Sequence, residues 1–132
     1  MGADQERNAG ASAAAAPGRT ASILVVDDDA AVREILVELL TDSGHRVREA
    51  GGGAEALRLL ADAPDVDLVI SDVQMPEMSG FELAEQLAAC HDGIKVILIS
   101  GYYVSRDAGW RVLRKPFRMH ELEAAVQAEL GG

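Results

Sequence analysis

Short runs of aliphatic residues alternate with segments of helical periodicity along most of the chain. The runs at 23–26, 68–70 and 96–99 consist of consecutive Ile, Leu and Val, which is typical of strands covered on both faces. Between the runs, apolar positions recur every three to four residues, the spacing of one apolar face on a helix. This alternation predicts an α/β fold with a doubly wound parallel sheet.

Two further strands are expected where the chain is less apolar. Residues 45–50 mix Val47 with charged neighbours, which favours an edge strand because charges discourage pairing with other chains. Residues 110–114 form another short, mixed strand. The apolar positions of the four expected helices are Val32, Ile35, Leu36, Leu39 and Leu40; Ala56, Leu57 and Leu60; Leu83, Ala84, Leu87 and Ala88; and Leu122, Ala125, Val126 and Leu130. We expect each group to pack on the sheet.

The connection between the last two strands is unusually short. Residues 101–109 are bounded by glycines, whereas a right-handed crossover normally needs about a dozen residues. We therefore expect a loop or a turn or two of helix there, so that the fourth helix of the fold is short or missing.

The length of 132 residues leaves room for one domain. Residues 1–20 are rich in Ala and Gly and lack periodicity, so we expect a flexible leader before a folded domain at 21–132. No segment approaches the roughly 18 apolar residues of a membrane span, and the N-terminus lacks the positive start of a secretory signal. These features predict a cytoplasmic protein that does not contact membranes.

The composition is acidic, with 12 Lys and Arg against 22 Asp and Glu and a formal net charge of -10. Excess carboxylate disfavours binding to nucleic-acid phosphates, whereas metal ions or cationic partners suit it. Cys90 is the only cysteine, so it cannot form an internal disulfide, and we expect it to pack in the fold.

Acidic residues follow two of the expected strands. Asp27, Asp28 and Asp29 come directly after the first strand, and Asp72 follows the third, at the sheet edge where open α/β folds bind ligands. Mutual repulsion of these carboxylates would need a cation to offset it, and oxygen ligands favour Mg²⁺, with Mn²⁺ possible. The alternatives are helix capping, which we expect for Asp29, and a turn residue at Asp72.

Two more polar residues end the later strands. Ser100 could donate its hydroxyl to a bound anion, or it could be an ordinary turn serine. Lys115 could hold phosphoryl oxygens as a point charge, or it could be a solvated lysine in the basic segment 111–118. Their order at successive strand ends favours one shared site over unrelated roles.

Four segments in this order resemble the receiver domain of bacterial response regulators, the chemotaxis-regulator-like family of two-component signal transduction. They are ILVVDD at 23–28, SDVQMPEMSG at 71–80, IS at 99–100 and KPF at 115–117. The resemblance covers about residues 21–130. It implies a flavodoxin-like, five-stranded parallel sheet with strand order 2-1-3-4-5, and a cis bond between Lys115 and Pro116.

The resemblance also implies a phosphoacceptor function. Asp72 would accept a phosphoryl group from a phosphohistidine of a sensor histidine kinase or histidine phosphotransfer protein. Asp28, Asp72 and the backbone carbonyl of Gln74 would bind Mg²⁺, and Asp27 would help through a bound water.

Ser100 and Lys115 would bind phosphoryl oxygens in this scheme. Apart from self-phosphorylation and slow self-dephosphorylation the chain would not be an enzyme, and it would signal through an unidentified downstream protein.

The chain departs from the family's usual pattern at Val112, where most members carry an aromatic residue that moves on activation. Trp110, on the same face of that strand, or Tyr102 or Tyr103 in the preceding loop could replace it, although packing alone would also explain them. The short fourth helix belongs to a face through which many receivers dimerise, which leaves the oligomeric state open.

Two other functions remain open from the sequence. One is an unphosphorylated pseudo-receiver that acts as a scaffold, consistent with Val112 and the short crossover. The other is a Mg²⁺-dependent phosphohydrolase with an aspartate nucleophile, because Asp27 and Asp29 at alternate positions after a strand are similar to that enzyme class.

Overall fold

A computed structural model describes residues 20–63, 65–91, 93–102 and 109–131. Its five strands, β3 (Ser22–Val26), β4 (Arg46–Ala50), β5 (Leu68–Asp72), β6 (Lys95–Ser100) and β7 (Arg111–Arg114), form one parallel sheet. The strands lie in the order β4-β3-β5-β6-β7, which is 2-1-3-4-5 in chain order. This confirms the predicted flavodoxin-like fold, with the expected edge strand at β4.

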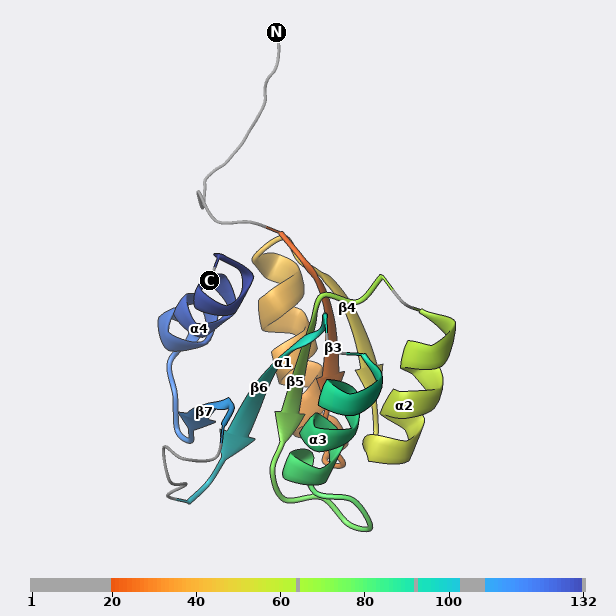
Figure 1. The fold of residues 1–132 in the computed structure, drawn as a ribbon. Coiled ribbons are helices and arrows are strands. Elements are labelled where there is room, and N and C mark those ends of the chain that lie inside the picture. The colour runs from red at the N-terminus through yellow and green to blue at the C-terminus, as the bar shows by residue number, and fades with distance from the viewer. Residues whose placement is uncertain (1–19, 64, 92, 103–108, 132) are drawn as a thin grey trace, which may run out of the picture.

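Helices cover both faces of the sheet (Figure 1). Helices α1 (Ala30–Asp42) and α4 (Met119–Gly131) pack on one face, and α2 (Gly53–Asp62) and α3 (Gly80–Cys90) pack on the other. No helix within the described residues is long and apolar enough to cross a membrane.

The described residues between β6 and β7, numbered 101, 102, 109 and 110, form bends and no helix. Residues 103–108, the middle of the predicted short crossover, lie outside the described part of the chain, as do residues 1–19 of the predicted leader.

The aliphatic runs form strands because their alternating side chains fill two separate cores. Ile23 and Val25 of β3 face the α1 and α4 side, whereas Leu24 and Val26 face the α2 and α3 side. All four are at most 1% exposed, and each such burial stabilises the fold by roughly 1.5–3 kcal/mol. The continuous hydrophobicity of the central strands is thus explained by helices on both faces.

The predicted apolar face of the first helix is wrong at Ile35. This residue is 57% exposed, whereas Leu36 and Leu40 are buried, with Val32 and Val37 packed beside them. Successive helical residues are about 100° apart, so the contact with the sheet centres on Leu36 and Leu40 and leaves Ile35 outside it.

Helices α1 and α3 begin at the carboxyl edge of the sheet, and side chains at their first turns cap them. Asp29 caps α1, its carboxylate accepting hydrogen bonds from the N–H groups of Ala31 and Val32 at 3.0 and 3.3 Å, as expected. Ser79 and Glu82 form a reciprocal capping box at the start of α3.

The only cysteine, Cys90, lies at the other end of α3. It is exposed, so the expectation that it packs in the fold is wrong.

Gly80 lets α3 begin directly against the end of β5. A Cβ atom at this position would lie 2.4 Å from the carbonyl oxygen of Asp72 and 3.0 Å from the Cα of Val73. The N–H of Gly80 also donates to the carbonyl of Val73 at 2.9 Å. Since the neighbouring atoms are backbone, only a residue without a side chain fits here.

We predict that Gly80→Ala lowers the free energy of unfolding by about 2 kcal/mol, because the β5–α3 connection must shift to admit the methyl group. Urea denaturation measures this loss. Gly93→Ala is the control, since nothing lies within 4 Å of a Cβ there. Equal stability of the Gly80 variant and the wild type would contradict the close approach.

Candidate functional site

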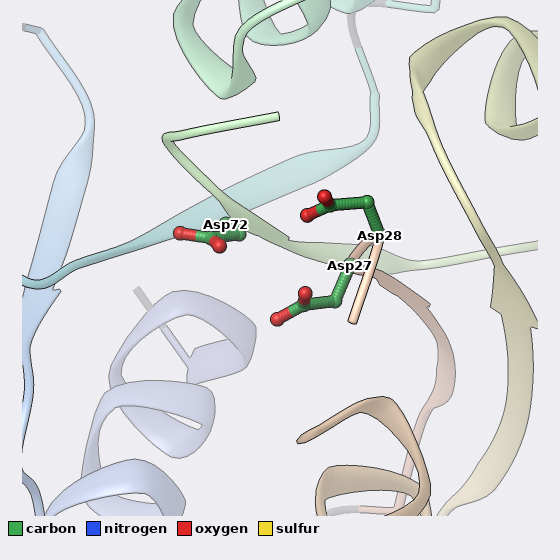
Figure 2. A group of neighbouring side chains, drawn as sticks. All are labelled: Asp27, Asp28 and Asp72. Atoms are coloured by element: carbon green, nitrogen blue, oxygen red, sulfur yellow. The ribbon is translucent and has the colours of Figure 1, made fainter. Parts of the chain in front are cut away.

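Three carboxylates meet at the carboxyl edge of the sheet. Asp27 and Asp28 follow β3. Asp72 is the last residue of β5, the strand that pairs directly with β3. One carboxylate oxygen from each residue lies within 4.8 Å of those from the other two. Figure 2 shows the side chains of Asp27 and Asp28 extending toward the side on which Asp72 lies. The structure therefore brings together Asp27, Asp28 and Asp72, as their positions after two strands predict.

Asp27 is the most deeply placed of the three, with 2% of its surface exposed. Burial raises the pKa of its carboxyl above the ordinary value, and the negative charges of Asp72 and Asp28 raise it further. The hydrogen bond from the N–H of Asp29 to Oδ1, at 2.8 Å, and the charge of Lys115 act in the opposite direction. The net effect is a buried negative charge that the protein compensates only in part.

Asp72 lies between the acidic pair and a lysine. Its Oδ2 is 3.8 Å from Nζ of Lys115, and its side chain is 13% exposed. Its Oδ1 accepts a long hydrogen bond, at 3.4 Å, from the N–H of Gln74. The loop that carries the predicted ligand carbonyl of Gln74 is thus held against Asp72.

Ser100 is the last residue of β6, and Lys115 directly follows the adjacent strand β7. The backbone N–H of Lys115 donates to the carbonyl of Ser100 at 2.8 Å. The expected cis bond between Lys115 and Pro116 is present. The buried hydroxyl of Ser100 donates to the carbonyl of Tyr102 at 2.8 Å and accepts from its N–H at 3.1 Å. Of the two predicted anion-binding residues, Lys115 therefore contacts Asp72, while the Ser100 hydroxyl bonds within its own loop.

The aromatic residues considered for the position of Val112 lie in different surroundings. Trp110 packs against Phe81 of α3, with ring centroids 6.3 Å apart and planes inclined by 53°. Val112 packs against the same core, so the two residues share the α2 and α3 side of the sheet, as strand alternation predicts. Tyr102 is 44% exposed, and Tyr103 lies outside the described residues.

One charged residue beside the acidic group was missed by the sequence reasoning. Arg33 of α1 donates from Nη1 to the backbone carbonyl of Asp27 and from Nε to Oε1 of Glu49, both at 2.8 Å. The available signal was its place one turn after the helix cap Asp29, which points a long side chain back toward the sheet edge. Arg33 lies within a helix, so the residues at the ends of the strands do not indicate it.

Comparison with known proteins gives one consistent family. Residues 23–127 match the family model of the response regulator receiver domain. The sensor kinase CckA of Brucella abortus is 39% identical over 119 residues, which make up 84% of this chain and 13% of CckA. Response regulator MprA of Mycolicibacterium vanbaalenii is 41% identical over 116 residues, or 82% of this chain and 49% of MprA. The chain thus spans less than half the length of these two relatives.

Among solved structures, the chain is similar to response regulator protein TrrA of Thermotoga maritima, crystallised in complex with Mg²⁺ and BeF. The TM-score is 0.76 at 35% sequence identity, and the match covers 83% of this chain and 99% of TrrA.

The raised pKa of Asp27 predicts how stability depends on pH without divalent ions. Native Asp27 binds its proton more tightly than the unfolded chain does, so its contribution to stability is present below the ordinary pKa of 3.8 and is lost as pH rises through the raised value. Asp27→Asn retains an oxygen acceptor for the N–H of Asp29 and removes the charge. We therefore expect this variant to gain stability over the wild type at pH 7.

Urea unfolding in EDTA at pH 7 and at a pH below 3.8 measures the stability difference between the two proteins. Asp65→Asn, at an exposed position before β5, is the control for removing a carboxylate elsewhere. A stability difference for Asp27→Asn that stays the same at both pH values would contradict the prediction.

Proposed function

The chain belongs to the response regulator receiver domain family, and we propose that it is the phosphoacceptor of a two-component phosphorelay. It takes a phosphoryl group onto Asp72 from a phosphohistidine of a sensor histidine kinase or histidine phosphotransfer protein, and it signals through a downstream protein. The observation that carries this proposal is the position of Asp72, with Asp27 and Asp28 on one side and Nζ of Lys115 at 3.8 Å on the other. Receiver domains are signalling domains, so we assign no metabolic reaction to the chain.

The acidic group suits Mg²⁺, or Mn²⁺ in its place. Asp27, Asp28 and Asp72 offer only oxygen donors within 4.8 Å of one another, the donor type that these ions prefer. The backbone carbonyl of Gln74 would complete the protein's ligands. Partial compensation of the charge on Asp27 also indicates that a cation would stabilise the group. When bound, the ion would neutralise phosphoryl oxygens and so allow a carboxylate to approach phosphorus.

The reaction at Asp72 transfers a phosphoryl group from a histidine nitrogen to a carboxylate oxygen. The oxygen of Asp72 forms a bond to phosphorus while the bond from phosphorus to the donor histidine nitrogen breaks and leaves its electron pair on that nitrogen. The other ring nitrogen of the phosphohistidine carries a proton, so the products are an aspartyl phosphate and a neutral imidazole. Lys115 stays in place to hold one phosphoryl oxygen, because its backbone is fixed to Ser100. The chain therefore contributes position and charge in this step.

Ser100 links the phosphorylated state to the loop that follows. Its hydroxyl proton is donated to the carbonyl of Tyr102, and a phosphoryl oxygen on Asp72 would be a stronger, charged acceptor. Transfer of this hydrogen bond to the phosphoryl group frees the Tyr102 carbonyl and changes the loop. This local exchange replaces the movement of an aromatic residue at the position of Val112.

The two alternative functions fit the structure less well. A phosphohydrolase with Asp27 as nucleophile needs a second carboxylate free to transfer a proton to the leaving group, but that of Asp29 accepts the first N–H groups of α1. A pseudo-receiver scaffold has no need for Lys115 beside Asp72.

We predict that Asp72→Asn abolishes Mg²⁺-dependent labelling by acetyl phosphate, because the amide cannot act as the nucleophile. Intact-protein mass spectrometry detects the added phosphoryl group. Asp65→Asn, at an exposed site before β5, should be labelled like the wild type.

Undiminished labelling of Asp72→Asn would refute the assignment of the phosphoacceptor. A wild type that no phosphodonor labels would favour the scaffold, and sustained release of phosphate from a small ester would favour the hydrolase.

We also predict that Lys115→Gln slows labelling by about 100-fold, since one fixed positive donor to the phosphoryl oxygens is lost. The initial rate at saturating Mg²⁺ measures this effect. Lys95→Gln removes an exposed lysine at the opposite end of β6 and should keep the wild-type rate. A similar loss in both variants would point to net charge and not to the position of Lys115.

A further inference from the structure

Arg33 joins three segments at the carboxyl edge of the sheet. From α1 its guanidinium reaches the carbonyl of Asp27 and the carboxylate of Glu49 near the end of β4, both at 2.8 Å. The Arg33 side chain is only 20% exposed, although that of Glu49 is 48% exposed. An exposed ion pair alone contributes little to stability, so the bond to the Asp27 carbonyl is the more informative contact.

The Asp27 carbonyl belongs to the peptide group that carries Asp28. The backbone N–H of Asp27 donates to the carbonyl of Ala50 at 3.2 Å, and the Oδ1 of Asp27 accepts from the backbone N–H of Asp29. With the Arg33 bond, the backbone and side chain of Asp27 are held at three points. Because the Asp27 carbonyl and the N–H of Asp28 belong to one planar peptide group, the Arg33 bond acts directly on the peptide from which Asp28 leaves the backbone.

Asp28 depends on this backbone support more than its two partners do. Asp27 and Asp72 each have a hydrogen bond to a backbone N–H. In contrast, the carboxylate of Asp28 has no hydrogen bond or ion pair with any residue in the described part of the chain. Asp28 is exposed, and its side chain extends toward Asp72 in Figure 2. Its position in the acidic group therefore comes from the peptide that Arg33 holds.

We infer that Arg33 is a positioning residue for the divalent cation: it orients the Asp27–Asp28 peptide so that both carboxylates face Asp72. The inference rests on the proposed function, because it concerns the same cation. Mg²⁺ demands near-octahedral geometry and ligand distances of about 2.0–2.1 Å, so small displacements of Asp28 weaken its binding. The rigid guanidinium can bond the carbonyl and Glu49 together, whereas the compact lysine ammonium is a poorer match for both.

Simple electrostatics predicts the opposite effect of removing Arg33. A positive charge near a cation site repels the cation, so its loss should tighten Mg²⁺ binding. Exchange for lysine should leave the affinity unchanged, because the charge is kept. Positioning predicts weaker binding in both cases, and the direction of the change therefore separates the two explanations.

The test is calorimetric titration of Mg²⁺ into the full chain and its Arg33→Gln and Arg33→Lys variants. Loss of a residue that orients a metal ligand typically costs about 10- to 100-fold in affinity, and we expect a loss in this range for Arg33→Gln and a smaller one for Arg33→Lys. Arg111→Gln is the matched control, since it removes the same charge from a comparable Arg–Glu pair, Arg111 with Glu129 at 2.7 Å, at the amino end of β7.

Circular dichroism and urea unfolding without metal show whether each variant is folded, since a purely structural role would lower stability and leave the Mg²⁺ affinity of the folded protein unchanged. If Arg33→Gln does not fold, Arg33→Lys carries the test, because it keeps the charge and the aliphatic stem. A folded Arg33→Lys with wild-type affinity, or a folded Arg33→Gln with tighter binding, overturns the inference.

Asp28→Asn distinguishes this failure from failure of the proposed cation site. If the wild type does not bind Mg²⁺, or Asp28→Asn binds it equally well, the site itself is wrong. If binding is weakened in Asp28→Asn but kept in both Arg33 variants, only the role of Arg33 is wrong.

Discussion

The structure depends on holding three carboxylates together at one edge of a parallel sheet. Asp27, Asp28 and Asp72 repel one another, and burial of Asp27 adds the cost of removing a charge from water. Nothing in the acidic group itself stabilises this arrangement. The two aliphatic cores and the pairing of β3 with β5 must therefore offset the free-energy cost of this arrangement.

The connections at this edge show how the fold keeps the group in place. Asp29 fixes the start of α1, Gly80 lets α3 begin against the backbone of Asp72, and Arg33 joins α1 to the ends of two strands. Apart from the bond between Arg33 and Glu49, these contacts involve the backbone, and none of them occupies a carboxylate oxygen of Asp27, Asp28 or Asp72. The site is thus organised by its surroundings before any ligand arrives.

The sequence predicts most of this fold for a simple physical reason: buried parallel strands are continuously aliphatic, and their carboxyl ends share one edge. That reasoning correctly places Asp27, Asp28 and Asp72 together. It fails for Ile35, because spacing alone does not determine which side of a helix touches the sheet. The same reasoning does not predict the Arg33–Glu49 pair or the hydrogen bonds of Ser100 to Tyr102. They depend on the rotation of α1 and on loop conformation, which apolar periodicity does not encode.

The distribution of positive charge explains why such a site would depend on a dissociable cation. Lys115 lies on one side of Asp72 and is itself partly exposed, at 36% of its side chain, so it offsets the acidic group only in part. Arg33 donates from Nε to Glu49 and from Nη1 to the Asp27 carbonyl, and not to a carboxylate of the acidic group. Within the described part of the chain, Lys115 pairs with Asp72, and no side chain forms an ion pair with Asp28. A protein cation fixed there would neutralise the group permanently and compete with any incoming phosphoryl group, whereas a divalent ion from solution leaves the charge of the site adjustable.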